Sequence, residues 1–96
     1  MTRERLLALL NIFDERERQE SLKAGGKFQF TCADSGISHA ERLAVLAEEF
    51  GEVSREVAEA VGSGLKVNGA ALRIELIQVA AVCVAWGEFL SKDGVE

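Results

Sequence analysis

Three glutamates crowd one short stretch in the middle of the chain. They are Glu48, Glu49 and Glu52, in the run EEFGE. Residues three or four positions apart are neighbours on a helix surface, so these carboxylates share one side, with Arg55 as the nearest cation. Each like-charge pair costs only about 0.2–0.5 kcal/mol on an exposed helix. The cluster is therefore either a solvated acidic face or a site that binds cations.

A second polar group interrupts the most apolar segment. Between Ile74 and Trp86 the polar side chains are Glu75 and Gln78, which are i,i+3 and share a helix face. A carboxylate in an apolar helix is costly to bury unless it is paired or bound to a metal. An antiparallel hairpin places Glu49 and Glu52 at heights similar to those of this pair. We therefore expect the two polar groups to converge.

Four carboxylates and one amide without a lysine need cations to hold together. Their oxygen atoms are the ligands that hard divalent ions prefer, with Mg²⁺ the first choice and Mn²⁺ the second. The predicted metal ligands are Glu48, Glu49, Glu52, Glu75 and Gln78.

Apolar spacing predicts three helices that would position these groups. The first covers about residues 3–21 after the N-cap Thr2, and its polar second half, DERERQE, is interpreted as a solvated extension or a frayed end. The second follows a capping box formed by Ser38 and Glu41 and ends near Gly62. The third covers about residues 69–92 after Asn68.

The third helix predicts an oligomer. Its middle, IELIQVAAVCVAW, has no polar face, and a helix that is apolar all round must be buried all round. Two other helices in a chain of 96 residues can hardly cover it. We therefore expect one all-α domain over residues 1–96, an antiparallel helical bundle completed by homo-oligomerisation as a dimer or tetramer.

The composition narrows the classes of partner. With 11 Lys and Arg against 16 Asp and Glu, the net charge is −5, which disfavours nucleic acid. No polybasic patch indicates a membrane partner, and the most apolar run is too short to span a bilayer. The N-terminus is not typical of a secretory signal. The two cysteines show no spacing typical of a disulfide framework or a metal site, which indicates reduced thiols. We expect a cytoplasmic protein.

Here the chain resembles a known family, the MazG-like all-α nucleoside triphosphate pyrophosphohydrolases. That family carries E-E-x-x-E on one helix and E-x-x-D on the next. The run Glu48–Glu52 is similar to the first motif, and Glu75–Gln78 to the second, with 22 residues between Glu52 and Glu75. The resemblance covers about residues 38–92 and departs at Gln78, where the family usually has Asp.

The resemblance implies a chemistry. Family members cleave nucleoside triphosphates, as ribo- or deoxyribonucleotides, to the monophosphate and pyrophosphate with Mg²⁺. It implies that the glutamates hold the metal and that Glu49 orients the attacking water. An amide binds a metal less strongly than a carboxylate does. The alternative is therefore a helical oligomer that has lost turnover through Gln78 and that either binds metal or nucleotide or has a structural role.

Four further residues are candidate substrate contacts. Lys27, Arg55 and Lys66 could meet phosphates, although each is also an ordinary surface cation. Phe30, in the long connection over residues 24–37, could stack on a base, or it could cover the end of the bundle.

Overall fold

The computed structural model describes residues 1–94 and contains three helices. These are α1 (Arg3–Ala24), α2 (His39–Gly62) and α3 (Gly69–Lys92). No strand occurs in this part of the chain, and the alternating KFQFT run is irregular, with bends at Lys27 and Gln29. The prediction of an all-α helical bundle is confirmed at this level.

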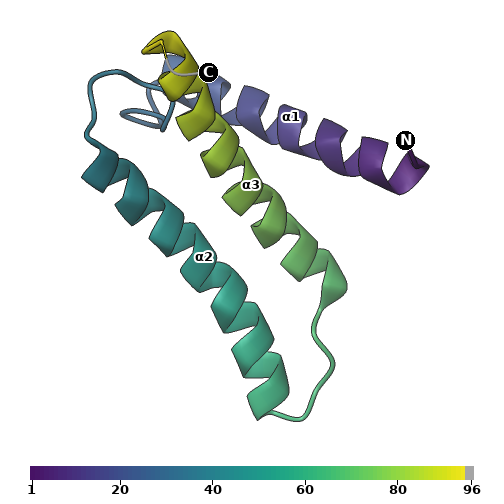
Figure 1. Ribbon diagram of the computed structural model, residues 1–96. Helices are drawn as coiled ribbons and strands as arrows, with labels where there is room; N and C mark the ends of the chain where they lie inside the picture. Colours follow the sequence, from purple (N-terminus) through teal and green to yellow (C-terminus); the bar gives the residue numbers. More distant parts are fainter. Residues whose placement is uncertain (95–96) are drawn as a thin grey trace.

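The helices α2 and α3 form an antiparallel hairpin (Figure 1). The capping box predicted at the start of α2 is present: Ser38 accepts a hydrogen bond from the Glu41 amide, and the Glu41 side chain accepts one from the Ser38 amide. Asn68 caps α3 by accepting from the amide of Ala71. These caps fix where both helices begin.

The central helix is α3, because α1 and α2 each pack on it rather than on each other within residues 1–94. The C-terminal half of α1 crosses the C-terminal half of α3, whereas the N-terminal half projects away from the hairpin (Figure 1). The molecule thus has a closed end, where all three helices and the connection over residues 25–38 meet. The opposite end, where the N-terminal halves of α1 and α3 diverge, is open.

The second half of α1 is neither frayed nor wholly solvated, so the prediction of a solvated or frayed extension is only partly met: Asp14, Glu17 and Arg18 are exposed. The helix continues to Ala24, and Arg16 is buried within it. The Arg16 guanidinium donates to both carboxylate oxygens of Glu88, at 2.6 and 3.1 Å, to Gln19 at 2.8 Å and to Glu20 at 2.7 Å. Partners on its own helix and on α3 therefore bring this polar segment into the bundle.

A second buried arginine fastens the long connection to the helices. Arg42 has no exposed surface, and its guanidinium donates to the backbone carbonyls of Cys32 at 2.9 Å, Ile37 at 2.8 Å and Asp34. Its charge also lies 3.6 Å from the centroid of the Phe89 ring. One side chain of α2 thereby holds three points of the connection against α3.

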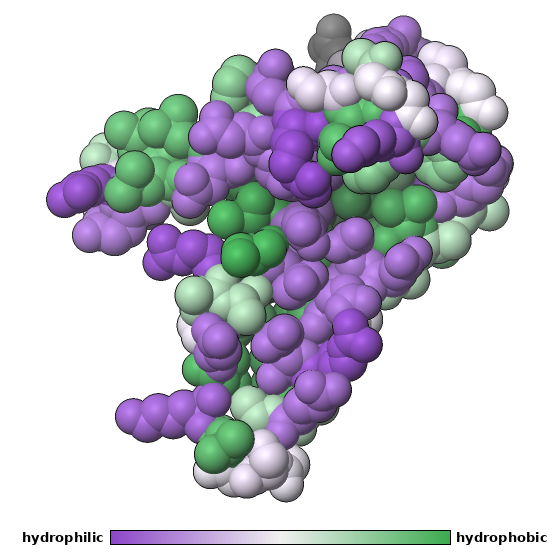
Figure 2. Space-filling model, turned by 180° about the vertical axis from the view of Figure 1, so that it is seen from behind, coloured by the Kyte–Doolittle hydropathy of each residue, from purple (hydrophilic) through white to green (hydrophobic). Residues whose placement is uncertain are grey.

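The apolar core is small and lies at the closed end. It contains Cys32, Ala33, Val82 and Ala85, with Val45 and Leu46 packed against it. In contrast, large side chains of α3 such as Ile74, Leu76 and Val84 are exposed in the single chain. Figure 2 shows apolar side chains gathered on the projecting end of α1 and in the hollow next to it. The apolar run was predicted to be too short to span a bilayer, but the whole of α3 is long and apolar enough to cross a membrane by length and composition alone, a test that the core helix of a soluble protein also passes.

Candidate functional site

Two carboxylates and an amide from α2 and α3 meet on the inner side of the hairpin. With its amide nitrogen turned toward them, Gln78 donates to Oε2 of Glu49 at 3.2 Å and to Oε2 of Glu75 at 3.1 Å. The predicted antiparallel register is responsible, because it sets Glu49 of α2 opposite the Glu75–Gln78 turn of α3. Three of the five predicted metal ligands therefore come together.

Glu49 lies among other carboxylates, and Arg18 and Lys27 line the same cavity. Burial raises the pKa of the Glu49 carboxyl above its ordinary value, and the negative charges of Glu75, Glu48 and Glu52 raise it further. A bound cation would reverse these effects, because it would stabilise the ionised carboxylate.

The other two predicted ligands lie further out on α2. Glu48 is exposed. Glu52 is ion-paired with Arg55, three residues along the same helix. Both act on Glu49 through their charge. Within residues 1–94, no three His, Cys, Asp or Glu side chains are grouped as ligands of one ion.

The residues that do converge fit one hard cation by their donor chemistry. Turning the Gln78 amide by half a turn places its oxygen where its nitrogen was, so three side-chain oxygens can face one point. Neighbouring ligand oxygens of an octahedral Mg²⁺ lie about 3.0 Å apart, given Mg–O distances of about 2.1 Å. The 3.1 and 3.2 Å separations at Gln78 are close to this value.

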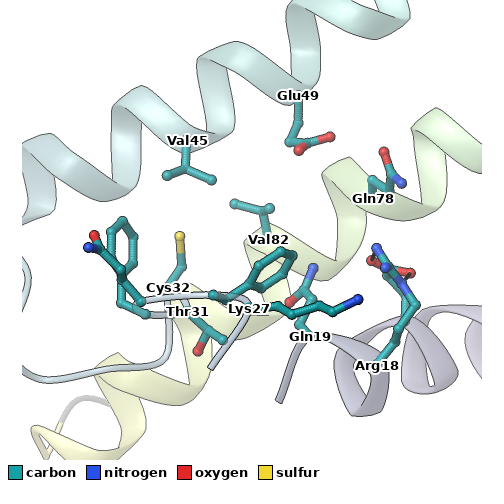
Figure 3. Close-up of a pocket in the computed structure, with 13 residues that line it drawn as sticks. Arg18, Gln19, Lys27, Thr31, Cys32, Val45, Glu49, Gln78 and Val82 are labelled. Atoms are coloured by element: carbon teal, nitrogen blue, oxygen red, sulfur yellow. Dashed lines mark hydrogen bonds and ion pairs between the residues drawn. The ribbon is translucent and has the colours of Figure 1, made fainter. Parts of the chain in front are cut away.

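A cavity of about 350 Å³ opens beside Glu49 and Gln78 (Figure 3). This volume lies in the range of small-molecule sites. Val45, Cys32 and Val82 form an apolar side of the cavity, and Figure 3 shows Lys27 across it from Glu49. The cavity therefore combines an acidic edge, an apolar wall and a cation.

The connection over residues 25–38 supplies a further wall, including Phe28 and Phe30. A turn at Gly26, with φ of +82°, lets the amide of Lys27 donate to the Leu22 carbonyl at 2.9 Å. Thr31 is buried, and its hydroxyl donates to Glu20 at 2.8 Å. These contacts hold Lys27 and the two aromatic rings at the cavity.

Two of the candidate substrate contacts, Lys27 and Phe30, line the cavity, and two do not. Lys66 is exposed in the connection between α2 and α3, and Arg55 is exposed on α2 and paired with Glu52. Neither belongs to the wall of the cavity.

The first helix contributes cavity residues that the sequence analysis missed. Glu15, Arg18 and Gln19 line the cavity from α1. Glu15 accepts two hydrogen bonds from the Arg18 guanidinium, at 2.8 and 2.9 Å. The i,i+3 spacing of this pair was visible in the sequence, but the polar DERERQE segment gave no sign that one of its faces is buried.

Comparison with known proteins adds no assignment. No protein-family model, curated protein or solved structure matches this chain.

Proposed function

We propose that this protein is an Mg²⁺-dependent nucleotide pyrophosphohydrolase, similar to the MazG-like family, that converts nucleoside triphosphates to monophosphates and pyrophosphate. The observation that carries the proposal is the meeting of Glu49, Gln78 and Glu75 at the edge of a cavity that also presents a lysine and two aromatic rings. Acidic ligands, a cation and aromatic rings are the three kinds of contact that a metal-bound nucleotide requires.

Each side chain at the site has a proposed role. Glu49, Glu75 and Gln78 hold the ion, Mg²⁺ or Mn²⁺, which when bound supplies Lewis-acid polarisation of a phosphate and a more acidic water. Glu49 accepts a hydrogen bond from the attacking water and orients it. Lys27 meets the phosphates, and Phe28 or Phe30 contacts the base. Arg18 could exchange its Glu15 partner for a phosphate oxygen, because its side chain is 52% exposed.

A pyrophosphate assay tests the proposed reaction. The purified protein is incubated with ribo- and deoxyribonucleoside triphosphates and Mg²⁺, and Glu49→Gln serves as the inactive variant. We expect Glu49→Gln to lose activity by about a hundredfold or more, as removal of an acid–base group does. Glu59→Gln, an exposed position on the same helix, removes the same charge and should retain activity. Equal pyrophosphate release by the wild type and both variants, or no release by any of them, would contradict the proposed enzymatic activity.

Thermal melting tests the metal separately from turnover. Millimolar Mg²⁺ should raise the melting temperature of the wild type, because an ion bound by the folded state stabilises it. Gln78→Asp should enlarge this shift, since a carboxylate replaces the neutral amide between two carboxylates. If neither Mg²⁺ nor Mn²⁺ changes the melting temperature of the wild type or of Gln78→Asp, the result argues against the metal site.

A specific observation also supports the alternative, a structural or a metal- and nucleotide-binding helical oligomer without turnover. The Gln78 amide can hold Glu49 and Glu75 together with no ion present, which lowers the demand for a cation at this place. A binding protein of this kind would show the Mg²⁺-dependent melting shift and a structural one would not, and neither would release pyrophosphate. In either case the proposed setting is the cytoplasm, and the proposed ligand is a nucleotide, not nucleic acid.

A further inference from the structure

Gln19 lines the cavity from α1, and its amide group is held in one orientation. Its Oε1 accepts a hydrogen bond from Nη1 of Arg16 at 2.8 Å. Arg16 is buried, and its guanidinium also donates to Glu88 of α3 and to Glu20 of α1. A guanidinium carries donors and no acceptor, so only the oxygen of the Gln19 amide can face it. The Gln19 nitrogen must therefore point away from Arg16.

The Gln19 nitrogen faces the cavity. Figure 3 shows Gln19 on the side of the cavity opposite Glu49, with its nitrogen directed inward and its oxygen away. Among residues 1–94 this nitrogen has no hydrogen-bond partner. Thr31 also lines the cavity, but its hydroxyl donates to Glu20 at 2.8 Å, so its donor is used within the protein. Gln19 thus offers a ligand in the cavity N–H donors and no acceptor.

We propose that the Gln19 amide binds the base of the nucleotide and selects the keto bases uracil, thymine and guanine over the amino bases cytosine and adenine. This inference rests on the proposed function, which places the phosphates at an ion held by Glu49 and Gln78. The two kinds of base differ in an exocyclic group on the side of the ring away from the sugar, an oxygen in one and an amino group in the other. A base that extends across the cavity from Glu49 presents this group to Gln19. The oxygen accepts from the amide, whereas the amino group meets another donor.

Adenine and phosphate both suit this amide less well. A glutamine with a free amide binds adenine through its oxygen and its nitrogen together, and the bond to Arg16 removes that arrangement. For phosphates, the cavity already presents the cations Lys27 and Arg18. Gln19 is neutral, and the same cavity has an apolar wall and two aromatic rings that suit a flat base.

Isothermal titration calorimetry measures the base preference without turnover. The probes are α,β-imido nucleoside triphosphates with Mg²⁺, which resist cleavage at the bond that the proposed enzyme attacks. The wild type should bind the uridine analogue about tenfold more tightly than the cytidine analogue, because one hydrogen bond is lost and two donors are opposed. The guanosine analogue should exceed the adenosine analogue by a similar factor. Equal affinities within both pairs overturn the inference.

Gln19→Glu tests whether the amide is responsible. The variant keeps an oxygen for Arg16 and replaces the inward N–H donors by an acceptor, so the keto preference should disappear or reverse. Gln29→Glu is the matched control, because it adds the same charge on an exposed side chain that also lines the cavity, and it should keep the preference. If Gln19→Glu weakens keto and amino analogues alike, the amide contacts a phosphate and the inference is overturned. If Gln19→Glu does not fold, Gln19→Met replaces it and should abolish the preference.

A pyrophosphate assay on the same wild-type preparation separates this inference from the proposed function. Preferential binding of the keto analogues without pyrophosphate release from UTP or GTP supports base selection and contradicts the enzyme. Release with equal kcat/KM from UTP, CTP, GTP and ATP overturns base selection and leaves the enzyme standing. Binding of none of the analogues overturns the inference, and pyrophosphate release then decides the proposed function alone.

Discussion

The closed and open ends of the bundle are stabilised by different interactions. At the closed end, two buried arginines, Arg16 and Arg42, join α1, α2, α3 and the long connection through directional hydrogen bonds. At the open end, α1 and α3 diverge around an apolar groove. Hydrogen bonds require their own partners, whereas an apolar groove accepts any surface of matching shape. The closed end therefore positions the cavity, while the open end has few directional contacts.

Removing Arg42 should have the largest effect on the stability of the closed end. Arg42→Ala leaves three backbone carbonyls without a donor and removes the cation from the Phe89 ring. We expect a loss of about 3–5 kcal/mol in the free energy of unfolding, measured by urea denaturation.

Arg55→Ala is the matched control for Arg42→Ala. Arg55 is exposed and pairs with Glu52 on the surface, so its removal should cost much less than the removal of Arg42. Similar losses in the two variants would show that the closed end does not depend on its buried guanidinium groups.

The next effect concerns the link between α1 and α3. Arg16→Met should cost about 2 kcal/mol, because Glu88 loses a partner whose side chain is only 7% exposed. A double-mutant cycle with Glu88→Gln measures their coupling. The Arg18–Glu15 pair, in which the Arg18 side chain is 52% exposed, is the comparison cycle and should couple more weakly. A stronger coupling in the comparison cycle would contradict this account.

The sequence predicted those elements whose signals are local. The caps at Ser38 and Asn68 act within three residues, and the apolar spacing of α2 and α3 set the hairpin. The convergence of Glu49 with Gln78 followed, because heights along an antiparallel hairpin can be counted from its turn. No such count was possible for α1, whose position depends on its packing against α3.

The two buried arginines were missed for a physical reason. The α3 partner of Arg16 is Glu88, 72 residues away, and a polar run such as DERERQE looks the same whether or not one face is covered. Arg42 bonds to backbone carbonyls, which every residue type carries, so no side-chain pattern marks its partners. The cavity depends on both residues and was therefore only partly predictable.

Hydrogen exchange can compare the two ends within one helix. Amides over residues 7–12 of α1 should exchange about tenfold or more faster than those over residues 16–22, a difference of about 1.4 kcal/mol. Uniform exchange along α1 would show that the open end is as stable as the closed end.

The smallest expected effect is electrostatic and lies between the two ends. The pKa of Glu49 is raised in the folded chain, so the folded state binds more protons than the unfolded state, and stability falls as the pH rises from the ordinary carboxyl value through the raised one. In metal-free buffer, Glu49→Gln should therefore be slightly more stable than the wild type at pH 7, by under about 1 kcal/mol because solvent screens the charge. This advantage should vanish below the ordinary carboxyl pKa, where the wild-type side chain is protonated in both states.

Glu59→Gln controls for the change in net charge. An equal gain in stability in that variant would contradict an effect specific to the surroundings of Glu49. Mg²⁺ should reverse the order, because it stabilises the ionised Glu49 of the wild type, which the variant lacks.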